Sequence, residues 1–144
     1  MDTSTLFSLE GRTALITGGS RGIGLMIARG FIAQGAKVYI SSRKAAVCDA
    51  VAEELGEQCH SLPMDVSTVE GCRALAEAYS NRESSLDILV NNAGAAWGAP
   101  FDEFPEQGWD KVMDLNVKSP FFLTQAFHPA LKAAASAAQP GIVI

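Results

Sequence analysis

Short apolar runs of strand length alternate along the chain with longer segments whose apolar residues recur at helical spacing. The short runs predict β-strands over residues 13–17, 37–41, 59–64, 86–90 and 141–144. Helical spacing predicts helices over 21–33, 44–55 and 67–79. Because strands and helices alternate in this way, we predict an α/β fold, with a doubly wound parallel sheet and helices on both faces.

The helical pattern also predicts which side chains face the core and where one helix begins. In the first helix we expect Ile23, Met26, Ile27 and Phe31 to point inward, and in the second Val47, Val51 and Leu55. Ser67 and Glu70 have the spacing of a capping box, which predicts the start of the third helix.

The segment 109–137 is helical in pattern but contains Pro120. A proline inside a helix removes a backbone hydrogen bond and clashes with the preceding turn. We therefore predict two consecutive helices, with Pro120 in the first turn of the second and Asn116 at the junction. The last apolar run reaches the end of the chain, so we expect the sheet to be truncated after the start of its fifth strand.

Composition and charge narrow the class of protein. The chain has 144 residues, of which 48% are hydrophobic and 19% charged, which fits one globular domain over residues 1–144. The net charge of −5 argues against a nucleic-acid partner or an anionic membrane surface. No apolar run is long enough to span a bilayer, and residues 1–12 lack the pattern of a secretory signal. The three widely spaced cysteines fit reduced thiols, so we expect a cytoplasmic protein with no metal site.

A glycine-rich segment, Thr17-Gly18-Gly19-Ser20-Arg21-Gly22-Ile23-Gly24, joins the first strand to the first helix. Glycines allow a tight turn and a close approach to a pyrophosphate, and the helix N-terminus supplies free amides. A purely structural turn would explain such a loop as well. Between a strand and a helix, the loop predicts a dinucleotide-binding domain of the Rossmann-like type.

The residues after the second strand, Ser41-Ser42-Arg43-Lys44, include no acid. Folds that prefer NAD place an acid there to bind the ribose 2′-hydroxyl. An arginine can instead pair with a 2′-phosphate, and Arg43 and Arg21 are the candidates. The alternative is that both arginines are solvated, but the missing acid favours NADP as the cofactor.

Two further groups follow predicted strands at the same sheet edge. Asn91-Asn92-Ala93-Gly94 comes directly after the fourth strand, and its small residues allow a ligand to lie against the backbone. Asp65 follows the third strand. A plain turn is the alternative for the first group, and helix capping together with Ser67 is the alternative for Asp65.

Together these motifs resemble the short-chain dehydrogenase/reductase (SDR) family over residues 9–144. The resemblance implies that the glycine loop binds the pyrophosphate, that Arg21 and Arg43 lie near the 2′-phosphate, and that Asp65 and Val66 lie beside the adenine. The cofactor-binding residues it implies are Thr17, Gly18, Ser20, Arg21, Gly22, Ile23, Gly24, Ser42, Arg43, Asp65, Val66, Asn92, Ala93 and Gly94. Within the family, residues 94–144 resemble the 3-oxoacyl-[acyl-carrier-protein] reductase type of rhamnolipid biosynthesis.

The resemblance also implies that Asn116 is the asparagine of the family's catalytic tetrad, where a held water extends a proton relay. An ordinary helix-end asparagine is the alternative. The serine, tyrosine and lysine of that tetrad have no counterpart here, because Arg43 and Glu83 stand four positions after Tyr39 and Tyr79. We therefore expect the N-terminal part of a longer reductase, inactive by itself.

The predicted activity is NADP-dependent hydride transfer between NADP(H) and a small carbonyl or alcohol substrate, with a 3-oxoacyl thioester as one option. The alternatives are a non-catalytic nucleotide-binding fragment or pseudoenzyme, and an interaction protein that uses the helices of 109–137. The family implies a homodimer or homotetramer for the full-length protein. The aromatic residues Trp97, Phe101 and Trp109 are candidates for a substrate cleft, with ordinary packing as the alternative.

Overall fold

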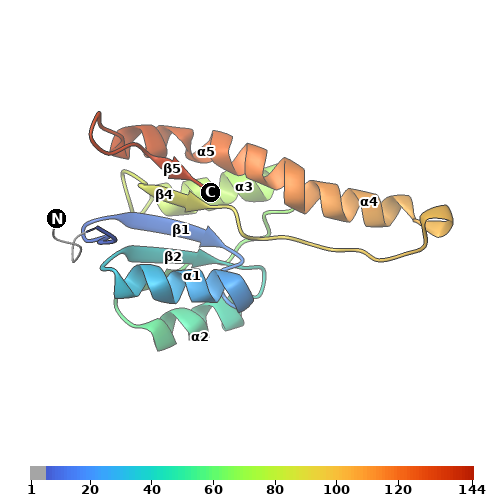
Figure 1. Cartoon of the computed structure of the whole chain (residues 1–144), viewed down its shortest axis with the longest axis horizontal. Coiled ribbons are helices and arrows are strands. Elements are labelled where there is room, and N and C mark those ends of the chain that lie inside the picture. The colour runs from blue at the N-terminus through green and yellow to red at the C-terminus, as the bar shows by residue number, and fades with distance from the viewer. Residues whose placement is uncertain (1–5) are drawn as a thin grey trace.

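The computed structural model describes residues 6–144, and in them the sheet has five parallel strands in the order β3-β2-β1-β4-β5 (Figure 1). The strands are β1 (Thr13–Thr17), β2 (Lys37–Ser41), β3 (Cys59–Ser61), β4 (Ile88–Val90) and β5 (Ile142–Val143). All neighbouring strands pair in parallel, with β1 at the centre between β2 and β4. The predicted doubly wound α/β sheet is confirmed. Residues 1–5, part of the N-terminal segment considered above, lie outside the described residues.

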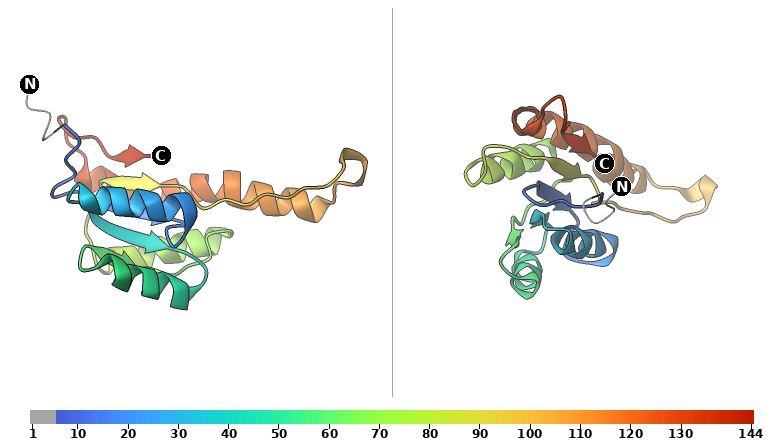
Figure 2. Two further views of the ribbon diagram at one scale, coloured as in Figure 1. Left: turned by 60° about the horizontal axis from the view of Figure 1, so that its bottom comes forward. Right: turned by 60° about the vertical axis from the view of Figure 1, so that its left-hand side comes forward.

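Helices cover both faces of this sheet (Figure 2). On one face lie α1 (Gly22–Ala33) and α2 (Ala45–Leu55), and on the other α3 (Val69–Ser80) and α5 (Ser119–Ala134). Alternate residues of β1 enter the two cores: Ala14 and Ile16 pack on the side of α1 and α2, and Leu15 on the side of α3 and α5. This alternation follows from the two-residue period of a strand.

The inward face of α1 is made of small residues. Gly24 and Ala28 are buried, whereas Ile23 and Met26 are about 69% and 70% exposed. The predicted inward position of these two side chains is therefore wrong, although Ile27 and Phe31 do pack against the core. At Gly24 the helix lies so close to the glycine loop that a Cβ would be 2.2 Å from the Gly18 carbonyl oxygen, so no larger side chain fits there. In α2 the predicted inward position of Val47 is also wrong, because Val47 is exposed while Cys48 and Ala52 are buried. Val51 and Leu55 do pack against the core, as predicted.

The third helix begins one residue later than the capping box predicts. Thr68, not Ser67, is the N-cap, and its Oγ1 accepts a hydrogen bond from the Gly71 amide at 3.0 Å. The Ser67 amide donates instead to Asp65 Oδ1 at 3.0 Å. Both hydroxyl residues can cap a helix, so the spacing alone did not distinguish them.

The helical stretch around Asn116 is continuous. A short 3₁₀ turn, η1 (Phe101–Glu103), precedes α4 (Glu106–Met113), which passes through a π-helical segment, η2 (Asp114–Lys118), directly into α5. The prediction of two separate helices is thus wrong in its break, while Pro120 does lie in the first turn of α5. The backbone accommodates the junction by widening one turn. The α4 end projects from the body of the molecule (Figure 1).

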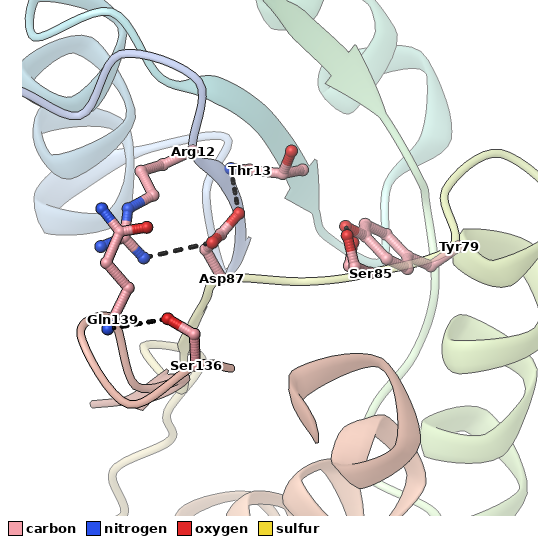
Figure 3. Close-up of polar contacts among 7 residues, drawn as sticks. All are labelled: Arg12, Thr13, Tyr79, Ser85, Asp87, Ser136 and Gln139. Atoms are coloured by element: carbon pink, nitrogen blue, oxygen red, sulfur yellow. Dashed lines mark hydrogen bonds and ion pairs between the residues drawn. The ribbon is translucent and has the colours of Figure 1, made fainter. Parts of the chain in front are cut away.

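At the amino ends of the central strands, the carboxylate of Asp87 joins the starts of β1 and β4 (Figure 3). Asp87 Oδ1 accepts a hydrogen bond from Arg12 Nη1 at 3.1 Å, and Asp87 Oδ2 accepts one from the Thr13 amide at 2.9 Å. Beside it, the Tyr79 hydroxyl donates to the Ser85 carbonyl at 2.7 Å. The two Asp87 contacts tie the start of β4 to the start of its neighbour β1.

Two expectations from composition can be compared with the described residues. All three cysteines are free and buried, as reduced thiols would be. None of the helices in residues 6–144 combines the length and the apolar character that crossing a membrane requires.

Candidate functional site

A cleft of about 530 Å³ lies at the carboxyl ends of the central strands. This is the edge at which open α/β sheets bind ligands. Eleven of the fourteen residues predicted to bind the cofactor line it. These are Gly18, Ser20, Arg21, Gly22, Ser42, Arg43, Asp65, Val66, Asn92, Ala93 and Gly94. Thr17, Ile23 and Gly24 are outside this lining.

The glycine loop turns through two left-handed positions, Gly18 with φ +67° and Gly22 with φ +55°. A Cβ at Gly18 would lie 2.9 Å from Asn92 Nδ2. A Cβ at Gly22 would meet nothing within 4 Å, so the backbone there faces open space. The loop therefore leaves room for a ligand in front of Gly22.

Thr17 and Asn92 bind the glycine loop to the segment after β4. Thr17 Oγ1 accepts hydrogen bonds from the Asn92 amide at 3.1 Å and the Ala93 amide at 3.0 Å, and donates to the Val90 carbonyl at 3.3 Å. Asn92 Nδ2 donates to the carbonyls of Thr17 and Gly18 at 3.0 and 3.3 Å. The hydroxyl of Thr17 is thus fully used beneath the cleft, and its role here is to hold two cleft walls together.

The first turn of α1 opens towards the glycine loop. Arg21 is the N-cap residue but makes no side-chain capping bond, and the first turn carries no acid. Uncapped first-turn amides and the helix dipole favour an anion. Since Arg21 and Gly22 also line the cleft, these donors fit a diphosphate.

The end of β2 supplies a second set of donors. The Oγ atoms of Ser41 and Ser42 are buried and have no hydrogen-bond partner, although both residues line the cleft. Arg43 and Lys44 lie beside them, and Lys44 is the N-cap residue of α2 but makes no side-chain capping bond. Buried hydroxyls without partners are costly, so this corner fits a phosphate ester that would accept from them.

Asp65 is the acid in the cleft lining. The hydrogen bond from the Ser67 amide lowers the pKa of this carboxyl, and Arg43 lowers it further. Asp65 therefore stays ionised at neutral pH, as an acceptor for an amino group such as that of adenine. Asp65 also closes the turn before α3, because it accepts the hydrogen bond from the Ser67 amide. It therefore has a structural role close to the helix-capping role that was the alternative for this residue.

Five residues that line the cleft were not predicted from the sequence. They are Ser41, Lys44, Val47, Met64 and Leu115. Ser41 and Lys44 adjoin the predicted Ser42-Arg43 pair and could have been included for that reason. Val47, Met64 and Leu115 are apolar residues from separate parts of the chain, and only the folded topology brings them to the cleft.

Asn116 lies in η2, and its side chain is bound to the segment after the cleft. Its Oδ1 accepts from the Ala95 amide at 2.8 Å, and its Nδ2 donates to the Ala95 carbonyl at 2.9 Å. Asn116 is outside the cleft lining, but a Cβ on Gly94 would lie 3.3 Å from its Oδ1. The amide is therefore engaged with protein, and its predicted place at a helical junction is correct.

Neither tyrosine reaches the cleft. Tyr39 and Tyr79 are buried in the core with their ring centroids 5.1 Å apart, and Tyr39 donates to Glu83 Oε1 at 2.6 Å. Burial raises the pKa of Tyr79 strongly. Within residues 6–144 no group of three His, Cys, Asp or Glu residues is arranged to bind a metal.

The three aromatic candidates for a substrate cleft lie outside the lining. Phe101 is about 94% exposed at the tip of the projecting segment, and Trp109 is exposed on α4. Trp97 packs against Gly108, where a Cβ would come within 2.7 Å of its ring. None of the three side chains borders the cleft formed by the predicted cofactor-binding residues, so their place in a substrate cleft stays a prediction.

Comparison with known proteins places this geometry among relatives. A family model described as short chain dehydrogenase matches residues 12–144. The rhamnolipids biosynthesis 3-oxoacyl-[acyl-carrier-protein] reductase of Pseudomonas aeruginosa is 49% identical over 140 residues, which cover 96% of this chain and 55% of that protein. Gluconate 5-dehydrogenase of Gluconobacter oxydans is 38% identical over 129 residues, covering 88% and 50%.

Solved structures give the same picture. The Pseudomonas aeruginosa RhlG/NADP active-site complex superposes with a TM-score of 0.92 at 49% identity, over 95% of this chain and 54% of that one. A metagenomic short-chain oxidoreductase in complex with NADP superposes with a TM-score of 0.80 at 37% identity, over 88% and 59%. The chain spans about half the length of the relatives it matches.

Proposed function

Because this chain belongs to the short-chain dehydrogenase family, we propose that it is the NADP(H)-binding part of an NADP-dependent oxidoreductase. The reaction is hydride transfer between NADP(H) and a carbonyl or alcohol substrate. The observation that carries the choice of cofactor is the corner after β2, where two cations and two unpartnered buried hydroxyls stand in place of an acid. NADP in the two solved relatives supports it.

Each wall of the cleft has a proposed task. The first-turn amides of α1, with Gly18, Ser20 and Gly22, bind the diphosphate. Ser42 and Arg43 bind the 2′-phosphate, assisted by Arg21. Asp65 and Val66 border the adenine, and Asn92, Ala93 and Gly94 continue along the cofactor. When bound, NADPH supplies the hydride that reduces a carbonyl, and NADP⁺ accepts one from an alcohol.

The proton-relay role that we propose for Asn116 involves its backbone. Both polar atoms of its side chain are bound to Ala95, which fixes the amide against that segment and leaves one Nδ2 hydrogen over. A π-helical turn, however, changes the pairing of main-chain carbonyls, and such turns are frequent at functional sites. A water held there would extend a relay from a lysine that the present sequence does not supply.

The substrate proposal is a small carbonyl or alcohol, with a 3-oxoacyl thioester suggested by the name of the Pseudomonas aeruginosa relative. General acid catalysis needs a proton donor beside the carbonyl, and the two tyrosines of this chain are buried elsewhere. We therefore propose that this chain binds the cofactor but is inactive by itself. The alternative remains a nucleotide-binding fragment or pseudoenzyme that catalyses no reaction.

The remaining proposals concern assembly and location. The full-length protein is a homodimer or homotetramer, which the exposed apolar side chains of Trp109, Val117 and Phe121 along α4, η2 and α5 support. The location is cytoplasmic.

The test of the cofactor proposal is calorimetric titration of the 144-residue chain with NADPH and with NADH. We expect saturable binding of NADPH and weaker binding of NADH. Equal affinity for both would remove the assignment of the corner after β2 to a 2′-phosphate. Binding of neither would contradict the proposed function. Adding a 3-oxoacyl thioester and following NADPH absorbance then tests whether this chain alone has activity.

A further inference from the structure

The segment after the cleft runs beside α4 without regular secondary structure and then turns back at η1 (Figure 1). It meets the helical stretch at two points. The first is the pair of hydrogen bonds between Ala95 and Asn116. The second is Trp97, whose indole lies on α4.

The seat of Trp97 on α4 depends on a glycine. A Cβ on Gly108 would lie 2.7 Å from Cδ1 and Cγ of the indole and 2.9 Å from Cδ2. Gly108 is the buried residue of α4, so the indole and the helix backbone are in direct contact. One turn on, Lys111 Nζ lies 5.4 Å from the indole ring centroid, at cation–π distance. The ring is therefore held between the notch that Gly108 leaves in the surface of α4 and the ammonium group of Lys111.

This seat is three residues from the cleft. Gly94 lines the cleft, and a Cβ added to it would lie 3.3 Å from Asn116 Oδ1. Gly94 follows β4, whereas Arg43 follows β2, and these strands flank β1 on opposite sides. Movement of Trp97 would therefore displace one end of the cleft and leave the Arg43 end in place.

We propose that Trp97 is a positioning residue for the cofactor: seated on Gly108 and covered by Lys111, it holds Gly94 against Asn116 and so keeps the nicotinamide end of the cleft in its binding position. This inference rests on the proposed function. The indole itself is outside the cleft lining, so in this proposal Trp97 acts on the cofactor through Gly94 and not by direct contact.

The first experiment compares two ligands on three proteins. NADPH occupies both ends of the cleft, while adenosine 2′,5′-bisphosphate occupies only the Arg43 end. In Trp97→Ala we expect the NADPH dissociation constant to rise about tenfold. This is the change expected when the binding-competent conformation of the cleft is populated in about one tenth of the molecules. Binding of the bisphosphate should be unchanged. Trp109→Ala, which removes the neighbouring exposed tryptophan of α4, is the matched control and should change neither ligand.

The second experiment uses the notch itself. Gly108→Ala places a methyl group where the indole sits, so in the wild-type background it should weaken NADPH as Trp97→Ala does. In the Trp97→Ala background the methyl group meets no ring, and the same change should have no further effect. This non-additivity identifies the Trp97–Gly108 contact as the cause, independently of either variant's stability. Trp97→Phe, which keeps an aromatic ring on the notch, should recover most of the affinity.

The outcomes separate this proposal from the proposed function. If the wild type binds neither ligand, the proposed function fails and the positioning role with it. If the wild type binds both ligands but Trp97→Ala loses affinity for both equally, or for neither, the positioning role alone is overturned. Additive effects of Gly108→Ala and Trp97→Ala would also overturn it.

Discussion

Three glycines of α1 allow the close packing of the cleft to be tested one position at a time. Gly22, Gly24 and Gly30 lie on the same helix but have different surroundings. A Cβ at Gly24 would lie 2.2 Å from the Gly18 carbonyl oxygen and 2.5 Å from Asn92 Nδ2. At Gly22 and Gly30 it would meet nothing within 4 Å, but only Gly22 has a left-handed backbone, with φ +55°. Replacement by alanine should therefore give three different results.

The expected magnitudes follow from these contacts. Gly24→Ala forces α1 away from the glycine loop, at a cost of about 1–3 kcal/mol for overpacking, and it disturbs the hydrogen bond from Asn92 to Gly18, worth about 1 kcal/mol. We expect a total loss of about 2–4 kcal/mol. Gly22→Ala carries only the left-handed strain of about 1–2 kcal/mol. Gly30→Ala should stabilise by about 0.5–1 kcal/mol, because alanine is the better residue inside a helix.

Urea unfolding followed by circular dichroism measures all three variants. NADPH titration then separates stability from binding. Gly22→Ala puts its methyl group into the open part of the cleft, so its affinity should fall at least tenfold, about 1.4 kcal/mol, despite the smaller loss of stability. Gly30→Ala should bind as the wild type does. If Gly24→Ala is no less stable than Gly22→Ala, the close contact between α1 and the loop does not exist as described.

Three further predictions concern the cofactor, pH and the isolated chain. Arg43→Asp should weaken NADPH by about ten- to a hundredfold and improve NADH relative to it, and an unchanged preference in parallel titrations would remove Arg43 from the assignment. The carboxyl of Asp65 has a folded pKa below its ordinary value of 3.8, so its contribution to stability is complete above that value and is lost as pH falls through the folded pKa. In Asp65→Asn, the fall of the urea midpoint at low pH should therefore be smaller than in the wild type. An identical dependence of the midpoint on pH would contradict the stabilising role of the Asp65 carboxylate. The chain by itself should show no turnover of NADPH with ketones or 3-oxoacyl thioesters and should self-associate on a sizing column, since Phe121 and Ile144 are about 63% and 65% exposed; robust turnover by a monodisperse species would refute both expectations.

The sequence was sufficient for the elements whose pattern and boundaries are local. Residues 13–17 and 37–41 were predicted with the observed bounds, because each is a continuous apolar run ended by glycine, serine or polar residues. The inward face of α1 could not be predicted in this way. Hydrophobicity favoured Ile23 and Met26, but Gly24 and Ala28 are the buried residues of α1, and at Gly24 the glycine loop is too close for any larger side chain.

The same distinction applies to the cleft. Its polar residues come from contiguous motifs at strand ends, so Ser42, Arg43 and Asn92 could be found from spacing alone. Met64 and Leu115 could not, because they carry no motif and reach the cleft only through the fold, Met64 from the segment after β3 and Leu115 from η2. The side chain of Asn116 was also beyond sequence reasoning, since its partner Ala95 belongs to a segment with no pattern.

The central position of β1 has a consequence for the order in which the protein is made. The strand that completes its pairing, β4, is encoded far downstream, and the hydrogen bonds that join Thr17 to Asn92 connect residues 75 positions apart. At a synthesis rate of about 5–20 residues per second, roughly 4–15 s pass between the addition of these two residues. During that interval a nascent chain can pair β1 with β2 and β2 with β3, but the other edge of β1 is open where β4 belongs. The cofactor cleft therefore cannot exist on the ribosome until the chain has grown beyond Gly94, and a translational pause placed before that residue would prolong the exposure of that edge.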